Sequence, residues 1–580
     1  MAYQLRHGTV KGKKTRSSAN KAQRITFSAL IIILVFSITS CSNDYIALSD
    51  IPQPALSVVG ALPASVLPVV VSASTSMETS RGVKPLPMVD PATVSEFQAD
   101  VPVCETGCAP KPEIDGEKPL IPQDLLVNLS SENAIVQPSY TSVPPVMYYT
   151  QAGDTLSAVA TRFDAQPSEI VSATLLNQSG FLDPNLLLLI PPVNMQTASN
   201  QKLMPDSELI YSPSAIDFDI NAFVVNAGGY LATYRQYLNS SGWLSGAGII
   251  RKVAIDNSIN PRLLLSLLQY QSNWVYGQPA NQTAIDYPMG HVEEYKKGLH
   301  AQLTWAVTQM SYSYYAWREG TLTTISFKDG SNLRAAPEIN AGTFALEYLF
   351  AQMYDQDSFD ASLFAASGFP AMHVSMFGDP WLKAVVYEPI FPSILAQPDL
   401  ILPIEPGVEW AYTGGPHSAW GKLGARAALD FAPSGAGGCS KSDEWVLAAA
   451  SGVVARSGGG VVVLDLDGDG NEQTGWNLFY MHIATEDRPV VGQWLDQGER
   501  LGHPSCEGGV STGTHFHFAR KYNGEWILAG GPLPFDMDGW IAHAAEKEYK
   551  GTLTRDDNTV NACTCATADT YIFRDEPGQE

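Results

Sequence analysis

The chain has few basic residues for its size. Lys and Arg number 35 against 59 Asp and Glu in 580 residues, which gives a formal net charge of −24 at pH 7. Seven of the basic residues fall within the first 25 positions, and without them the net charge is near −31. Contacts to nucleic-acid phosphates need Lys and Arg, so the composition argues against nucleic acid as a partner. It is typical of an exported, soluble surface protein.

The first 43 residues contain no Asp or Glu. A basic segment is followed by the apolar run 27–36, which is too short for a comfortable bilayer span. This order is typical of a secretory signal. The ending Ile38-Thr39-Ser40-Cys41 resembles a bacterial lipobox. That resemblance implies a signal peptide at 1–41 and a lipidated N-terminus at Cys41, hence a membrane-anchored lipoprotein of the cell envelope. An uncleaved N-terminal anchor is the alternative, and both place the remaining chain outside the cytoplasm.

Cysteine is scarce, with seven residues and no Cys-x-x-Cys pair that would indicate a Cys-based zinc site. Six cysteines follow Cys41, and an exported, oxidising setting permits disulfides. Connectivity does not follow from sequence alone. We expect Cys439 to pair with Cys506 and Cys104 with Cys108. Cys563 and Cys565 pair with each other or tie the last segment elsewhere.

Aromatic residues are sparse between 42 and about 145, where Pro, Ser, Val and Ala dominate. Such a composition cannot easily build a core, and its prolines favour extended backbone. We interpret 42–145 as a disordered tether that holds the following domains away from a membrane. A small β domain is the alternative.

Residues 146–193 have a different pattern. Asp154 or Thr155 can cap a helix with apolar residues at helical spacing. We expect a second short helix after Pro167 and apolar strands on either side of the pair. Gly-Asp-Thr-Leu at 153–156 and the Ile-Pro ending resemble a LysM module, a βααβ fold that binds N-acetylglucosamine in glycans. The resemblance implies a glycan groove at Gly153, Asp154 and Thr155 with the loop 180–183; a generic small α/β module is the alternative.

Residues 205–395 show apolar positions at spacings of three and four, which predicts a helical domain. Asn260-Pro261 is typical of a helix start. The stretch 255–275 resembles the lysozyme-like lytic transglycosylases, but Gln271-Ser272 stands where their Glu-Ser pair is found. Glutamine cannot act as a general acid, so we interpret this domain as degenerate and noncatalytic. Its aromatic residues are expected mainly in the core, with an exposed groove as the alternative (Trp274, Trp305, Tyr314, Tyr315, Trp317).

Residues 396–550 are rich in Gly and alternate apolar runs with turns such as Asn523-Gly524, which predicts an antiparallel β domain with a cleft. The chain as a whole is therefore expected to be multidomain α+β. Asp465, Asp467 and Asp469 have the spacing that opens an EF-hand-type calcium loop, but the twelfth position is Trp476. A plain hairpin turn is the alternative. We expect residues 551–580 to be a polar, poorly ordered tail.

Six of the ten histidines lie after residue 416. His515 and His517 are two residues apart in an alternating segment, so a strand would place both on one face. The same period places Tyr480 and His482 together. Asp430 lies in an apolar run where an unpaired carboxylate would be costly. Imidazole and carboxylate are suitable zinc ligands, so a metal would compensate the charge.

His417, the Leu-Asp-Phe at 429–431, Tyr480-x-His482 and the Thr-Gly-Thr-His-x-His at 512–517 resemble the lysostaphin/staphylolysin-type zinc endopeptidases, which cleave peptidoglycan peptides. The thirteen-residue step from His417 to Asp430 resembles the staphylolysin and beta-lytic branch. The resemblance covers roughly 395–545 and implies that His417, Asp430 and His517 bind one Zn²⁺. It implies catalytic, non-ligand roles for His482 and His515.

The expected chemistry is hydrolysis of a peptide bond by a zinc-activated water. His515 would move the proton and His482 would stabilise the oxyanion, although the two roles are interchangeable at this stage. No His-Glu-x-x-His motif indicates a helix-borne zinc site. The expected partners are the peptide crosslinks and glycan of peptidoglycan and a membrane at the N-terminal lipid. A noncatalytic regulator of other wall hydrolases is the alternative, but it would lack at least one of the three ligands.

Overall fold

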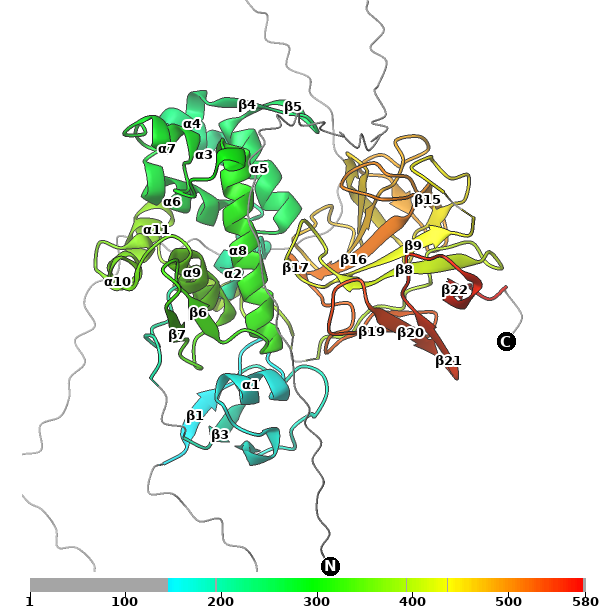
Figure 1. Cartoon of the computed structure of the whole chain (residues 1–580), viewed down its shortest axis with the longest axis horizontal. Coiled ribbons are helices and arrows are strands. Elements are labelled where there is room, and N and C mark those ends of the chain that lie inside the picture. The colour runs from blue at the N-terminus through cyan, green and yellow to red at the C-terminus, as the bar shows by residue number, and fades with distance from the viewer. Residues whose placement is uncertain (1–143, 193–195, 393, 436, 577–580) are drawn as a thin grey trace, which may run out of the picture. The chain divides into compact units, whose positions relative to one another are not determined.

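A computed structural model describes residues 144–576 apart from 193–195, 393 and 436. The predicted signal peptide, Cys41, nearly all of the tether at 42–145 and the Cys104–Cys108 pair lie outside the described residues. The described chain combines helices with antiparallel sheets, which confirms the α+β class (Figure 1). No helix in this part of the chain has the length and apolarity needed to cross a membrane.

Residues 146–190 form a small three-stranded antiparallel sheet, in the order β1-β3-β2, that packs around one helix. Thr155 caps the helix by accepting a hydrogen bond from the backbone N–H of Ala158 at 3.2 Å. The elements are β1 (Val146–Tyr149), α1 (Leu156–Arg162), β2 (Val171–Ser172) and β3 (Leu187–Ile190).

The second helix expected after Pro167 was a wrong prediction. The chain makes a single 3-10 turn, Pro167–Glu169, and then enters β2, which pairs with β3. The β-branched Val171 favours a strand, and Asn177-Gln178-Ser179-Gly180 favours turns over helix. The βααβ order implied by the LysM resemblance is therefore missing its second helix.

Residues 205–390 are mainly helical, as predicted, and include two short hairpins. The helices are α2 (Asp206–Leu209), α3 (Ile220–Ala227), α4 (Tyr230–Thr233), α5 (Gly246–Asn257), α6 (Pro261–Ser272), α7 (Gln282–Asp286), α8 (Leu299–Glu319), α9 (Ala341–Ala351), α10 (Gln356–Phe364), α11 (Phe369–Phe377) and α12 (Pro380–Tyr387). The hairpins are β4 (Arg235–Leu238) with β5 (Gly242–Ser245), and β6 (Thr324–Ser326) with β7 (Asn332–Arg334).

The five aromatic side chains singled out in the helical segment lie in its core or pack against it. Trp274, Tyr314, Tyr315 and Trp317 are buried, and Trp305 packs partly buried against the same cluster. This confirms the core interpretation over an exposed aromatic groove. The start of α6 is also as predicted, because the Asn260 side chain accepts a hydrogen bond from the Arg262 N–H and Pro261 occupies the first turn.

Residues 400–572 form the β domain. Its main sheet has the order β14-β11-β12-β13-β16-β9-β8-β22, with β17 paired to β16, and its pairs are antiparallel. The strands are β8 (Trp410–His417), β9 (Ala428–Pro433), β10 (Val446–Leu447), β11 (Gly452–Gly458), β12 (Val461–Asp465), β13 (Trp476–Met481), β14 (Trp494–Leu495), β15 (Arg500–Gly502), β16 (Phe516–Tyr522), β17 (Glu525–Trp526), β18 (Asp536–Met537), β19 (Trp540–Ala544), β20 (Gly551–Arg555), β21 (Asn558–Asn561) and β22 (Tyr571–Ile572).

The two faces of the main sheet bury different partners. We call the face that carries Asp430, His517 and Phe479 the front face, since strand register places these side chains on one side. Front-face residues such as Phe479 and Ala519 belong to the same apolar cluster as α5, α6, α8 and α9. The back face, with Phe516 and Phe518, packs within the β domain.

Residues 551–572 contain three strands, contrary to the poorly ordered tail expected at 551–580. Strands β18 to β21 make a four-stranded antiparallel sheet, and β22 pairs with β8 at the edge of the main sheet. Leu553, Val560 and Ile572 are buried in the back-face cluster. Polar residues dominate this segment because its short strands expose one side, and the few apolar positions at alternate spacing carry the packing.

Leu553→Ala is expected to lower the free energy of unfolding by about 2–4 kcal/mol, because Leu553 is fully buried and its truncation leaves a cavity. Denaturant titration against the exposed Val490→Ala checks this. Equal stability of the two variants would show that residues 551–572 do not belong to the core.

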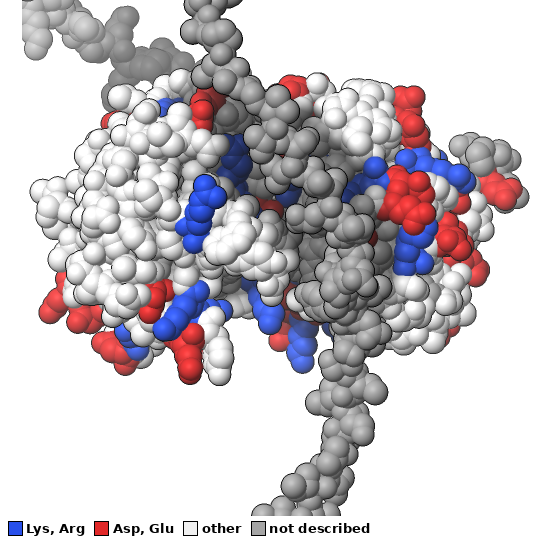
Figure 2. Space-filling model, turned by 90° about the horizontal axis from the view of Figure 1, so that it is seen from above, with Lys and Arg blue, Asp and Glu red and all other residues white. Residues whose placement is uncertain are grey.

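Charged residues make up 16% of the chain. Uncharged side chains accordingly cover most of the described surface seen in Figure 2, and Lys and Arg lie beside Asp and Glu at several places on it. Neither sign dominates the described part of that face.

Candidate metal centre

Three potential ligands converge on the front face from three strands. His417 ends β8, Asp430 lies in the neighbouring β9, and His517 in β16 is the direct cross-strand partner of Asp430. β8 shifts register twice between Tyr412 and His417, which brings the end of the strand over Asp430. Residue 414 must be glycine here, because a Cβ would lie 2.5 Å from Asp430 Oδ2.

The ligand atoms form a small triangle. His417 Nε2 lies 3.0 Å from His517 Nδ1, and Asp430 Oδ1 lies 3.2 Å from each of these nitrogens. Tetrahedral zinc with bonds of about 2.0–2.1 Å requires ligand separations of about 3.3 Å. The three atoms therefore have the spacing of three corners of a zinc tetrahedron.

The remaining nitrogen of each ring is held by a backbone carbonyl. His417 Nδ1 lies 2.8 Å from the Gly415 oxygen, and His517 Nε2 lies 3.0 Å from the Ala419 oxygen. These carbonyls fix the proton on the outer nitrogens, so both inner nitrogens present lone pairs toward Asp430. Asp430 Oδ1 is buried without a hydrogen-bond partner. His417 Nε2, Asp430 Oδ1 and His517 Nδ1 are thus three acceptor atoms that face one another with no hydrogen-bond donor between them. Such an arrangement fits a bound cation.

The electrostatics also indicate that the Asp430 carboxyl group is ionised. Burial would raise the pKa of Asp430, but His417 and His517 hold it well below its usual value. Burial would lower the pKa of His417, yet the Asp430 carboxylate raises it. Burial lowers the pKa of His517. The carboxylate is thus ionised, and a neutral His517 is available as a ligand.

His482 and His515 flank the triangle. Their ring centres are 4.5 Å apart, and His515 Nε2 lies 3.7 Å from Asp430 Oδ1. Each Nδ1 faces a backbone carbonyl, that of Glu507 at 2.8 Å for His482 and that of Gly513 at 2.7 Å for His515. In this tautomer both Nε2 atoms are proton acceptors. The division of the base and oxyanion roles between His482 and His515 stays a prediction.

The predicted shared side of Tyr480 and His482 is wrong. Tyr480 points into the back-face core, where its hydroxyl accepts the Ala449 N–H. His482 follows the end of β13 with φ 66°, a left-handed conformation that breaks the strand alternation and turns its ring to the front face. Such backbone is unusual for a residue other than glycine and occurs often at functional sites. Burial and the neighbouring histidines lower the pKa of His482 to about 4.

Residues 202–390 match the family model described as LasA, N-terminal domain. The chain is 26% identical to protease LasA of Pseudomonas aeruginosa strain PAO1 over 350 residues, which cover 56% of this chain and 75% of that protein. Protease LasA of strain UCBPP-PA14 is 25% identical over 344 residues, with the same coverage.

Solved structures with similarity include pseudoalterin, a deep-sea M23 metalloprotease, at 23% identity and a TM-score of 0.26, with 31% of this chain and 100% of that chain covered. The catalytic domain of lysostaphin from Staphylococcus simulans is 24% identical with a TM-score of 0.16, with 21% and 89% covered.

Tyr549 is a site residue that the sequence analysis missed. Its ring stacks on His417 with centres 4.1 Å apart. Its backbone carbonyl accepts a hydrogen bond from the Gly415 N–H, and its N–H donates to the Pro416 carbonyl. Tyr549 also has positive φ, at 63°. It lies 32 residues beyond His517 in a polar stretch, and no motif marks it.

A disulfide ties the loop that supports the flanking histidines. Cys439 pairs with Cys506, as predicted, and Cys563 pairs with Cys565. Cys506 precedes Glu507, whose carbonyl holds His482. The Cys439–Cys506 bond therefore ties the segment whose Glu507 carbonyl holds His482 to the loop that contains Cys439.

Asp465, Asp467 and Asp469 also lie close together, with one carboxylate oxygen each within 4.8 Å of the others. Asp465 ends β12, and Asp467 and Asp469 lie in the turn before β13, not in a helix–loop–helix. Asp465 Oδ2 accepts the Gly470 N–H at 2.8 Å. Burial and the adjacent carboxylates raise the pKa of Asp465 to about 6. Calcium at this turn stays a prediction.

The predicted glycan residues have different environments. Gly153 and Thr155 line a cavity, together with residues of α8 and β17. The Asp154 carboxylate is buried and accepts hydrogen bonds from Tyr148, the Gln151 N–H and Arg162. Internal donors thus occupy the carboxylate, and a glycan-binding role for Asp154 stays a prediction. In the helical segment, Gln271 accepts a hydrogen bond from Tyr354.

Proposed function

We propose that this chain is an exported zinc metalloendopeptidase that hydrolyses the peptide crosslinks of peptidoglycan. The observation that carries the proposal is the triangle of His417 Nε2, Asp430 Oδ1 and His517 Nδ1, with sides of 3.0–3.2 Å. The similarity to relatives named protease LasA supports it. A noncatalytic regulator is less well supported, because all three ligands are present.

In this proposal, His417, Asp430 and His517 hold the metal. A zinc ion held there would supply Lewis acidity toward a water molecule and toward the scissile carbonyl. His515 is the better placed base, because it is partly exposed and its Nε2 lies 3.7 Å from Asp430. It accepts a proton from the attacking water and returns it to the leaving amine. His482, neutral at pH 7, faces His515 and orients the same water.

The other parts of the chain would place this centre at the wall. Residues 146–193 would bind N-acetylglucosamine of the glycan as a LysM-like module, and Cys41 would carry a lipid that anchors the protein to a membrane. The helical segment at 205–395 would be noncatalytic, since Gln271 replaces the acid of the enzymes it resembles.

The test is incubation of the intact protein with purified peptidoglycan, with and without a zinc chelator, followed by identification of new amino termini. Release of amines is expected only without chelator, and its loss is expected in His417→Ala. His543→Ala is the matched control, because His543 is exposed in the same β domain and pairs only with Thr554. Amine release that survives chelation or the His417 substitution would contradict the proposal.

A further inference from the structure

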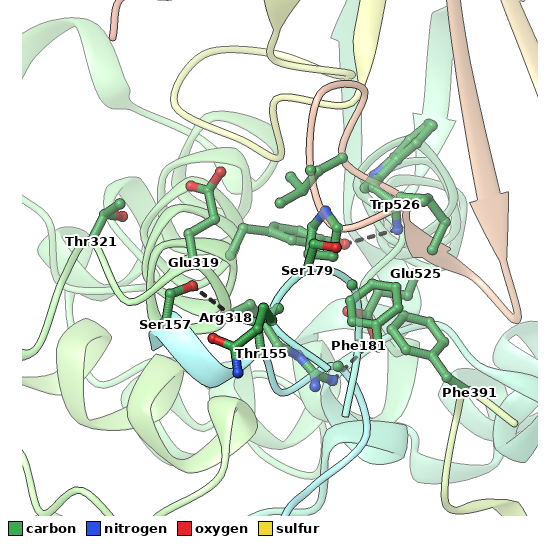
Figure 3. A pocket seen from close by; sticks show the side chains of 18 residues that line it. Thr155, Ser157, Ser179, Phe181, Arg318, Glu319, Thr321, Phe391, Glu525 and Trp526 are labelled. Atoms are coloured by element: carbon green, nitrogen blue, oxygen red, sulfur yellow. Dashed lines mark hydrogen bonds and ion pairs between the residues drawn. The ribbon is translucent and has the colours of Figure 1, made fainter. Parts of the chain in front are cut away.

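A cavity of about 390 Å³ lies where three segments of the chain meet (Figure 3). We call it the junction pocket, and define it by the lining residues within 153–157, 178–181, 315–321 and 525–532 together with Phe391. The first two ranges belong to the small N-terminal sheet unit, the third to the end of α8, and the fourth to β17 and the loop after it. Its volume is in the range of small-molecule sites.

One wall of the junction pocket is apolar. The rings of Phe181 and Phe391 pack with centres 5.3 Å apart (Figure 3). Trp526, Ile527 and Leu528 also line the pocket. Aromatic faces of this kind pack against the C–H surfaces of flat, partly apolar ligands.

Small polar groups also line the pocket. Ser157, Gln178 and Ser179 are exposed residues that line the pocket with hydroxyl and amide groups, and Thr155 lies beside them. The Glu319 carboxylate adds an acceptor from the last turn of α8. These groups can donate to and accept from a ligand with several hydroxyls.

Each charged side chain that lines the pocket has a partner of opposite charge. Arg318 is buried and its Nη2 lies 3.3 Å from Glu525, 3.0 Å from Asp206 and 2.8 Å from the Tyr314 hydroxyl. Glu319 pairs at 3.2 Å with Arg426, which does not line the pocket. The single lining cation among the described residues is thus committed to carboxylates, which disfavours a phosphate or carboxylate ligand.

We propose that the junction pocket binds one N-acetylated hexosamine unit of the wall glycan, and that α8 and β17 complete a site that the small N-terminal unit does not form alone. The acetamido methyl and the ring C–H face would lie on Phe181 and Phe391. The hydroxyls would meet Gln178, Ser179 and Glu319. The inference deepens the proposed function, on which the choice of wall glycan rests, by assigning sugar-binding residues outside 146–193.

A composite site has a mechanical consequence. β17 pairs with β16 through Tyr522 and Glu525, and β16 carries His517. A sugar held against β17 is therefore attached to the strand that carries a metal ligand. Glycan binding and peptide cleavage would occur on one rigid strand pair, not on two modules joined by a free linker.

The composite character is tested by calorimetry on the intact protein with the trimer of N-acetylglucosamine, using the trimer of glucose as the ligand without acetamido groups. Glu319→Ala is expected to weaken binding of the acetylated trimer by about tenfold or more, the loss of one good hydrogen bond to a charged group. Arg426→Ala breaks the same ion pair from outside the pocket and is expected to bind like the parent protein. Equal affinity of the two variants would overturn the composite site.

The location is tested by a matched pair on α1. Ser157→Trp would fill the pocket from an exposed position, whereas Thr161→Trp adds the same bulk one turn further, outside the lining. Loss of binding only in Ser157→Trp supports the site. Binding that survives in Ser157→Trp, no binding by the parent protein, or equal binding of the glucose trimer would overturn it. Amine release from peptidoglycan without sugar binding would refute the sugar site and leave the peptidase proposal standing. Sugar binding without amine release would refute the peptidase proposal and leave the sugar site standing.

Discussion

Asp430→Asn is expected to lower the rate of peptidoglycan hydrolysis by at least about a thousandfold. The carboxylate is the only anion of the triangle, and His417 and His517 hold its pKa well below the usual value, so it is ionised at working pH. An amide has the same shape but supplies no negative charge to a divalent ion. Metal catalysis contributes several kcal/mol of stabilisation, and each roughly 1.4 kcal/mol is a factor of ten in rate.

The measurement is the rate of amine release from purified peptidoglycan, with thermal unfolding as the check on folding. Asp465→Asn is the matched control, because Asp465 is also a buried strand carboxylate but lies at the acidic turn between β12 and β13. It is expected to keep most of the activity. Comparable losses in both variants would mean that the triangle has no special role.

Arg318→Met is expected to lower the free energy of unfolding by about 3–5 kcal/mol at pH 8, the second large effect. The substitution leaves Asp206 and Glu525 buried without their shared cation. Arg500→Met is the control, since Arg500 pairs with Glu405 at an exposed position and such pairs contribute about 0–1 kcal/mol. Similar losses in the two variants would contradict a buried network at the junction.

The loss in Arg318→Met should depend on pH. Burial raises the pKa of Glu525 from its usual 4.5 to about 7, even with Arg318 beside it. When the pKa of a group is higher in the folded than in the unfolded state, its contribution to stability is complete below the unfolded-state pKa. That contribution is lost as the pH rises through the folded-state pKa. Without Arg318 the pKa of Glu525 rises further, so the variant is expected to lose less stability at pH 5 than at pH 8. Denaturant titration at the two pH values measures the difference, and a loss that is constant or larger at pH 5 would contradict it.

The motifs that resemble the zinc endopeptidases predicted that His417, Asp430 and His517 act together, and the structure brings one ligand atom of each within 4.8 Å of the others. Metal binding by these residues stays a prediction. β8, which ends at His417, pairs with β9, which carries Asp430, and His517 lies opposite Asp430 in register. Alternation in 514–518 also placed His515 and His517 near one another. The Asn523-Gly524 turn was predictable because this pair favours turns with positive φ, which both residues adopt. The expected Cys439–Cys506 pair is also present, although connectivity does not follow from the sequence.

Other features depend on backbone exceptions and on distant packing, which local patterns do not show. His482 reaches the front face only through its positive φ, whereas the strand period predicted the opposite face. Tyr549 reaches His417 through bonds to Gly415 and Pro416 from a stretch with no apolar period. The strands after residue 550 are short and polar outside, so composition alone suggested a tail. The junction pocket combines residues more than 300 positions apart, and no single segment indicates it.

The central claim is that His417, Asp430 and His517 share one divalent ion. Anomalous diffraction at the zinc edge from crystals of the purified protein tests it most directly. The expected result is one peak about 2.0–2.2 Å from His417 Nε2, Asp430 Oδ1 and His517 Nδ1. A map without a peak between these three atoms, or with zinc bound only at the acidic turn of Asp465, would contradict the account.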